Sequence, residues 1–152
     1  MLRETLNQAL KDAMKAKDAQ RIATLRLILA ALKDRDIAAR TSGDDRTGIP
    51  EDAILSLLQT MVKQRRESIT MYEQGSRQDL ADKERAEIAV IESFLPKQLS
   101  EAEVEAAARA AIAEAGAQGI KDMGKAMGIL KAKYAGQMDF AKAAAILKSQ
   151  LS

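Results

Sequence analysis

The side chains that usually carry enzyme chemistry are scarce in this chain of 152 residues. It contains no histidine and no cysteine. Serine–histidine and cysteine–histidine relays are therefore excluded, and so are metal sites ligated by imidazole or thiolate. Carboxylates, lysine, tyrosine and hydroxyl groups remain as candidates for catalysis.

Paired carboxylates can act as general acid and general base when their environments differ. The acidic clusters of this sequence are Asp44–Asp45, Glu84 with Glu87, and Glu101 with Glu103 and Glu105. The first cluster falls in a polar loop, and the others are explained by helix capping or by an exposed helix face. None has a second convergent group. We therefore predict no catalytic residue, no metal ion and no cofactor.

Lysines accumulate after residue 120. Residues 98–119 hold four glutamates and one arginine, a net charge of −3, whereas residues 120–152 hold six lysines and two aspartates, a net charge of +4. Such a reversal is typical of a small domain that presents one basic surface to a polyanion. The alternative is that the lysines only solvate the outer faces of alanine-rich helices. The candidate RNA-binding residues are Lys121, Gly124, Lys125, Lys131, Lys133, Lys142 and Lys148.

Gly124 and Gly128 lie one turn apart in a predicted helix, where each glycine destabilises the helix by about 1 kcal/mol relative to alanine. Either another helix packs closely against the bare backbone, or a sugar–phosphate backbone approaches it beside Lys125. From the spacing alone, helix packing is the better explanation. A glycine-rich phosphate loop is excluded, because no strand precedes these residues and the chain has no P-loop pattern.

Arg65 lies in a densely charged segment, but on a helix it falls on the apolar side, beneath Ile69 and Tyr72. An arginine in that position usually snorkels to the surface or meets a carboxylate of another helix. Glu84 and Glu87 are the expected partners. Anion binding by Arg65 is the alternative.

The elements that hold these residues are all predicted to be helices. Aromatic residues make up only 3% of the chain, and the apolar residues are mainly Ala, Leu, Ile and Met, which favour helices over strands. Apolar residues at helical spacing predict helices near residues 2–15, 18–40, 50–75, 76–95, 101–115, 121–134 and 139–151. No apolar run is long enough to span a membrane, and no secretory hydrophobic segment is present. These features predict a soluble, cytoplasmic protein.

Pro96 divides the predicted helices into two groups. Proline has no amide hydrogen and disfavours a helical conformation at Leu95, so the preceding helix should end there. Ser100 and Glu103 then have the spacing of a capping box that begins a new helix. We predict an all-α protein with two domains. Residues 1–96 form a helical domain with a long helical hairpin, and residues 97–152 form a small three-helix bundle.

Four segments carry a family pattern: Thr24–Ile28 with Ala30–Lys33; Val62–Ile69 with Tyr72–Glu73; Gly75, Arg77, Asp79–Ala81 and Lys83–Glu84; and Phe94–Ser100. Together with Lys121–Met127 in the tail, they resemble the GatB/YqeY family. Its members are similar to the non-catalytic end of tRNA-dependent amidotransferase B subunits. The match covers almost the whole chain, and the combination of segments is far more specific than any one of them.

The resemblance implies two all-helical domains, the second similar to the three-helix tail that contacts tRNA in amidotransferase B subunits. It also implies an association with carbon–nitrogen ligase activity, with glutamine as the amido donor. It supplies no active site, because amidation takes place in domains that this chain lacks. Two positions depart from the family pattern. Ala132 follows Lys131 where proline is common, and Gln137 replaces a common arginine, which removes a phosphate contact.

These observations lead to the hypothesis of an accessory protein that binds tRNA or another structured RNA and has no catalytic centre of its own. The alternative is a protein-interaction module whose N-terminal helices dock a partner while the charge of the tail serves solubility. A glutamine-dependent ligase in its own right is the least favoured hypothesis, because His, Cys and an amidase-like Ser/Lys signature are missing. No contact with a membrane is expected.

Overall fold

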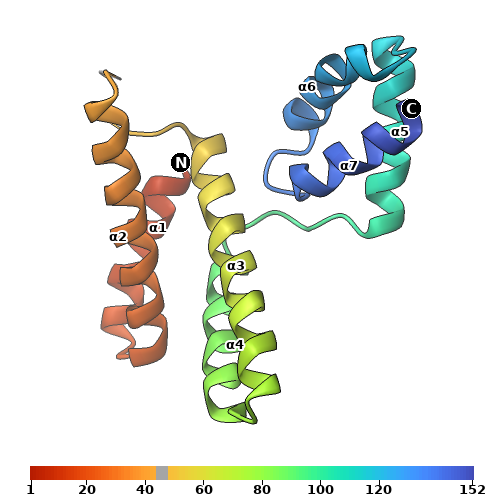
Figure 1. Cartoon of the computed structure of the whole chain (residues 1–152). Helices are drawn as coiled ribbons and strands as arrows, with labels where there is room; N and C mark the ends of the chain where they lie inside the picture. The colour runs from red at the N-terminus through yellow and green to blue at the C-terminus, as the bar shows by residue number, and fades with distance from the viewer. Residues whose placement is uncertain (44–47) are drawn as a thin grey trace. The chain divides into compact units, whose positions relative to one another are not determined.

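A computed structural model describes residues 1–43 and 48–152 and confirms the predicted all-α fold. In these two ranges the chain forms seven α-helices and one short 3-10 helix, and no strand. It divides into two compact units, Met1–Leu95 and Pro96–Ser152, and each has a hydrophobic core of its own (Figure 1). No helix in the described part of the chain is long and apolar enough to cross a membrane.

Unit 1 contains four helices. They are α1 (Leu2–Lys15), α2 (Ala19–Thr41), α3 (Glu51–Gln74) and α4 (Gln78–Glu92), and α3 and α4 form the predicted hairpin (Figure 1). The side chains of Leu6, Leu25, Ile28, Leu58 and Ile91 are completely buried between them. Each of the four helices thus contributes to one continuous core, which positions the polar groups described below.

α4 ends at Glu92, earlier than the apolar pattern predicted. Phe94 and Leu95 lie beyond the helix, yet both still pack against the core of unit 1. The guanidinium of Arg21 lies over the Phe94 ring, 5.5 Å from its centroid. The segment before Pro96 is therefore held in unit 1 by its side chains and by two turn hydrogen bonds, from the Phe94 and Leu95 amides to the last carbonyls of α4.

The start of α1 is joined to the α2–α3 connection by a polar clamp. Both guanidinium nitrogens of Arg3 donate to the Asp36 carboxylate, at 2.7 and 3.1 Å, and one of them also donates to the Ile49 carbonyl at 3.2 Å. Asp36 in turn accepts the Ile49 amide at 2.8 Å. A Cβ atom on Gly48 would clash with a terminal nitrogen of Arg3, so a side chain at this position would displace the guanidinium from Asp36.

Unit 2 contains three α-helices and the 3-10 helix. They are α5 (Glu101–Ala115), η1 (Ile120–Asp122), α6 (Met123–Lys133) and α7 (Phe140–Leu151). The predicted capping box at the start of α5 is confirmed: the Ser100 hydroxyl accepts the Glu103 amide at 3.2 Å, and the Glu103 carboxylate accepts the Ser100 amide at 3.1 Å. At the other end, Gly116 closes α5 in a left-handed conformation with φ of 63°.

The three α-helices of unit 2 enclose a core of small and branched side chains. Ala108, Ala126, Leu130, Ala143 and Leu147 are completely buried in it. The connecting segment before α5 is bonded to this unit through its backbone, because the Leu99 amide donates to the Gln137 carbonyl at 2.8 Å. The Gln98 side chain donates to the neighbouring Gly136 carbonyl at 2.6 Å.

Candidate nucleic-acid interface

α6 has one buried side and one open side. Ala126 and Leu130 are its buried residues. With about 3.6 residues per turn, Gly124 and Gly128 fall on the opposite side of the helix. Both glycines are exposed.

The open side of α6 has no packing partner within unit 2. A Cβ atom on Gly124 or on Gly128 would meet no atom within 4 Å. Helix packing, the explanation favoured from the spacing, is therefore wrong for this glycine pair. Nothing in the bundle offsets the helix destabilisation of about 1 kcal/mol that each glycine brings. The bare backbone is open to contact from outside.

Lysines border the two glycines. Lys125 and Lys131 are six residues apart, which puts them about 120° apart around α6, one on each side of the glycines. Lys121 precedes them in η1, and all three lysines are exposed. The five residues of this glycine–lysine strip are Lys121, Gly124, Lys125, Gly128 and Lys131. Gly128 was not among the predicted RNA-binding residues, although its spacing of one turn from Gly124 was the signal for it.

Lys133 points to α5 instead of joining the strip. Its ammonium group lies 2.6 Å from the Glu114 carboxylate, and this hydrogen bond raises the pKa of Lys133. The two side chains are 54% and 52% exposed. An ion pair with this much solvent contact stabilises the fold weakly, so Lys133 remains available to an anionic ligand at small cost.

The two lysines of α7 are exposed but do not form one row. Lys142 and Lys148 are again six residues apart, so they lie about 120° apart around their helix. No ion pair or hydrogen bond within residues 96–152 joins either of them to the glycine–lysine strip. Their participation in a common RNA-binding face stays a prediction.

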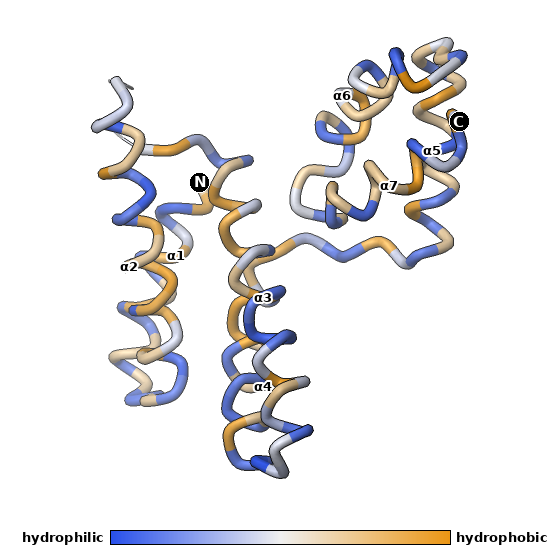
Figure 2. The backbone as a smooth tube through the Cα atoms, viewed as in Figure 1, coloured by the Kyte–Doolittle hydropathy of each residue, from blue (hydrophilic) through white to orange (hydrophobic). Residues whose placement is uncertain are grey.

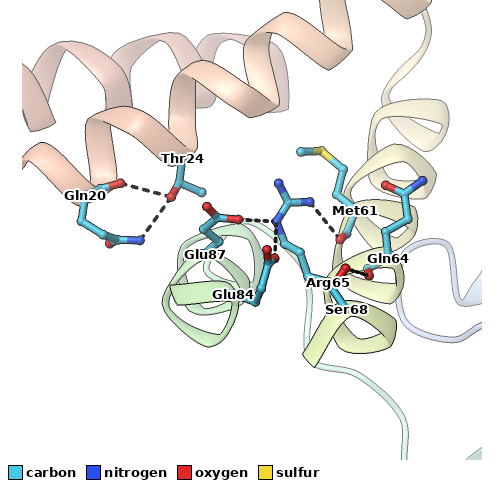
Figure 3. A network of polar contacts seen from close by, with 8 residues as sticks. All are labelled: Gln20, Thr24, Met61, Gln64, Arg65, Ser68, Glu84 and Glu87. Atoms are coloured by element: carbon cyan, nitrogen blue, oxygen red, sulfur yellow. Dashed lines mark hydrogen bonds and ion pairs between the residues drawn. The ribbon is translucent and has the colours of Figure 1, made fainter. Parts of the chain in front are cut away.

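In unit 1 the predicted ion pair of Arg65 is confirmed. Its Nε atom lies 2.9 Å from Glu87 and 3.9 Å from Glu84, and its Nη1 atom donates to the Met61 carbonyl at 3.1 Å (Figure 3). All three charged side chains are at most one-fifth exposed. They link the hydrophilic middle of α3 to α4 (Figure 2). The geometry favours ion pairing over binding of an external anion.

The two carboxylates beside Arg65 differ in their electrostatics. Burial, reinforced by the charge of Glu87, raises the pKa of Glu84 above its ordinary value. Glu87 holds the shorter contact with the guanidinium. Arg65 of α3 is therefore bound to α4 mainly through Glu87, and Glu84 is the carboxylate that is more easily protonated.

The other acidic clusters have structural roles or lie outside the described residues. Glu103 belongs to the capping box, and the Ser100 amide that it accepts lowers its pKa. Glu101 and Glu105 are exposed on α5. Asp44 and Asp45 lie in the range that the structure does not describe. Elsewhere in the chain, no group of three or more Asp and Glu residues is placed to hold a metal ion.

Comparison with known proteins identifies a family. The profile of the "Yqey-like protein" family matches residues 3–151. Curated relatives include the "Altered inheritance of mitochondria protein 41, mitochondrial" of three yeasts. The protein of Lachancea thermotolerans is 36% identical over 103 residues, which cover 66% of this chain and 52% of that protein. The protein of Candida glabrata is 35% identical over 91 residues, which cover 60% and 48%. The protein of Eremothecium gossypii is 36% identical over 90 residues, which cover 59% and 46%.

These relatives correct one prediction. The chain spans about half the length of the relatives that it matches, and their names place those proteins in mitochondria. The predicted cytoplasmic location is contradicted by these names. The prediction failed because a lack of long apolar segments speaks against secretion and membrane insertion, but it does not distinguish one aqueous compartment from another.

Proposed function

Since this chain belongs to the YqeY-like protein family, we propose that it acts as an accessory protein that binds tRNA or another structured RNA and has no catalytic centre of its own. The binding site is the glycine–lysine strip of η1 and α6. Lys133, Lys142 and Lys148 add positive charge at the periphery of this site.

The observation that carries the proposal is the open glycine pair between two exposed lysines. Two glycines inside a helix, facing no protein atom, reduce stability without any packing gain. They also remove every side chain that would keep a sugar–phosphate backbone away from the helix. Lys125 and Lys131, on the two sides of the glycines, supply ammonium groups for the flanking phosphates.

The resemblance of unit 2 to the tail of amidotransferase B subunits supports tRNA as the RNA. It also supports an association with glutamine-dependent amidation, carried out by a separate enzyme. Purified protein should release no ammonia from glutamine. Release of ammonia by this chain alone would contradict the absence of a catalytic centre.

A titration of the full chain with tRNA at low and moderate ionic strength tests the binding. Each lysine that neutralises a phosphate adds about 0.9 to the slope of log affinity against log salt for a duplex. The variant Lys125→Glu with Lys131→Glu should lose most of its affinity and reduce this slope by about 1 per lysine. The matched control is Lys11→Glu with Lys15→Glu on the exposed side of α1, which changes the net charge equally. Equal losses in both variants, or no binding at low salt, would refute the proposed site.

The role of the bare backbone has its own test. Gly124→Gln with Gly128→Gln keeps every lysine and improves helix propensity, but it covers the open side of α6 with side chains. If the RNA backbone approaches the glycines, this variant binds tRNA more weakly while unit 2 becomes more stable. Unchanged affinity would mean that the lysines act as point charges and that the glycines have another role.

Recovery of partners from lysate, with and without nuclease treatment, separates RNA binding from protein docking. Partners that disappear after nuclease treatment support the RNA hypothesis. If every partner survives nuclease treatment and none depends on RNA, the alternative in which the chain acts only through protein docking by its N-terminal helices is supported instead.

A further inference from the structure

α2 exposes an apolar row on the side that faces away from the core of unit 1. Leu25, Ile28 and Leu32 are buried on its inner side. Ala23, Ala30 and Ile37 recur every seven residues on the opposite side, and all three are exposed. Leu27, beside this row, is 46% exposed, and Ile37 is 48% exposed. Two large apolar side chains thus face solvent on one helix face.

A row of cations follows the apolar row on one flank. Arg26, Lys33 and Arg40 also recur every seven residues, and all are exposed. Within residues 1–43 and 48–95, no ion pair joins Arg26 or Lys33 to a carboxylate. This distinguishes them from Arg3 and Arg65, whose guanidinium groups are bound to carboxylates of neighbouring helices. Asp34 is the acidic residue on the other flank of the apolar row.

We propose that this α2 outer face docks an amphipathic helix of a protein partner. The α2 outer face consists of Ala23, Arg26, Leu27, Ala30, Lys33, Asp34 and Ile37. The partner helix carries an apolar row with acidic residues every seventh position on the flank that meets Arg26 and Lys33. We expect a helix, because a second helix has the same seven-residue repeat and can therefore align apolar and charged contacts with those of α2 over several turns. Ala30, at the centre of the face, allows the two helices to approach closely.

Charge complementarity favours such a partner over a second copy of this chain. In an antiparallel pair of α2 helices related by a two-fold axis, like flanks face each other, so the two cation rows would meet and repel. In a parallel pair, Lys33 would find the single carboxylate of Asp34. A nucleic acid is also a poorer match, because Leu27 and Ile37 offer it apolar surface and Asp34 repels its phosphates.

The test uses the isotope-labelled full chain and two synthetic helical peptides three heptads long. Both have the same leucine–alanine row, and one flank carries glutamate in the first peptide and lysine in the second. The glutamate peptide should shift the amide resonances of α2. The variant Arg26→Glu with Lys33→Glu should bind this peptide about tenfold more weakly, since exposed charge pairs across an interface contribute modestly. The lysine peptide should prefer this charge-reversed variant to the original chain.

A matched steric variant, Ala30→Gln, should weaken the binding of both peptides equally, so that the chain still prefers the glutamate peptide to the lysine peptide. Three results would overturn the proposal. The first is a glutamate peptide that leaves the α2 resonances unchanged or binds the charge-reversed variant equally well. The second is tRNA shifting the same α2 resonances, which would assign the face to RNA. The third is a dimer in sedimentation that dissociates on Ile37→Asp, which would assign the face to a second copy. None of these results depends on the glycine–lysine strip of unit 2.

Discussion

Unit 1 and unit 2 place their cations differently. In unit 1, the side chain of Arg65 is 14% exposed and that of Arg3 is 31% exposed, and each is bound to a carboxylate from another helix. The unit also has more exposed pairs, such as Arg66 with Glu92. In unit 2, the cross-helix pair Lys133–Glu114 is about half exposed, and the strip lysines lie on an open helix side. The difference indicates that Arg3 and Arg65 link helices of unit 1, whereas the strip lysines of unit 2 are exposed to solvent.

The same contrast applies to glycine. Gly48 in unit 1 lies against the Arg3 guanidinium, where a side chain would displace it. Gly124 and Gly128 in unit 2 face open space. A side chain would therefore disturb an internal contact at the glycine of unit 1, and it would meet no protein atom at the two glycines of unit 2. The residue type is the same in both units, and the difference lies in whether other side chains surround the glycine.

The largest expected effect concerns the polar clamp of unit 1. Asp36→Ala removes the carboxylate that binds Arg3 and the Ile49 amide, and it leaves both donors without this acceptor. We expect unit 1 to lose about 2–3 kcal/mol of unfolding free energy. Urea titration combined with hydrogen exchange of unit 1 amides measures the loss. Asp34→Ala, on the exposed side of the same helix, should change stability by less than about 0.5 kcal/mol. If both variants lost the same unfolding free energy, the ion pair of Asp36 would contribute no more to stability than the exposed carboxylate of Asp34.

A matched pair of glutamates compares the two units directly. Glu87→Gln weakens a pair in which both side chains are 14% exposed, and Glu114→Gln weakens one in which both are about half exposed. The first variant should destabilise unit 1 by about 1–2 kcal/mol, and the second should change unit 2 by less than about 0.5 kcal/mol. The same urea and hydrogen-exchange measurements apply. A larger loss in unit 2 would contradict the assignment of its charges to the surface.

Glycine replacement tests the open side of α6. Gly124→Ala and Gly128→Ala should each stabilise unit 2 by about 1 kcal/mol, because a methyl group meets no atom there and alanine is the better helix former. Gly116→Ala is the control. Its φ of 63° is left-handed, so alanine should destabilise unit 2 by about 1 kcal/mol. Thermal unfolding of the three variants gives the signs, and destabilisation by alanine at 124 or 128 would indicate a packing role after all.

The smallest effect is the pH dependence of unit 1, where two carboxylates act with opposite sign. The hydrogen bond from Arg3 lowers the pKa of Asp36, so its contribution is present above the unfolded pKa of about 4 and is lost as the pH falls through the folded pKa. Burial raises the pKa of Glu84, so its ionisation disfavours the folded state as the pH rises above about 4. Glu84→Gln should therefore retain its full unfolding free energy at neutral pH. Asp36→Asn should show a smaller loss of unfolding free energy as the pH falls below about 4. Urea titrations of both variants and of the original chain at several pH values between acidic and neutral test the two predictions.

Several local features were predictable from the sequence because they depend on residues close together in the chain. The capping box of Ser100 and Glu103 requires a spacing of three residues, and the structure confirms it. The ion pair of Arg65 with Glu87 followed from helical periodicity and from a short connection that forces two helices into a hairpin. The capping box depends on a spacing of three residues, whereas Arg65 and Glu87 are 22 residues apart and meet because the short connection folds α3 back along α4.

Features that join distant segments were not predictable in the same way. Arg3 and Asp36 are 33 residues apart, and no residue near Asp36 in the sequence indicates that Arg3 is its partner. For Gly124 the sequence favoured packing, and the structure shows an open helix side. Which side of a helix is covered depends on how neighbouring helices rotate about their axes.

The sequence by itself determined the helices, the capping box at Ser100, the division near Pro96 and the residues that line each helix face, because hydrogen bonding and apolar spacing are local properties of a chain. It did not give every helix end, since α4 begins after Arg77 and ends at Glu92. Only the tertiary structure decided which faces are covered. It bound Arg3 and Arg65 to carboxylates of other helices and left one side of α6 and the α2 outer face open. The physical reason is that burial is a property of neighbouring elements, so the same glycine or cation supports the fold where a helix packs on it and meets solvent or a ligand where none does.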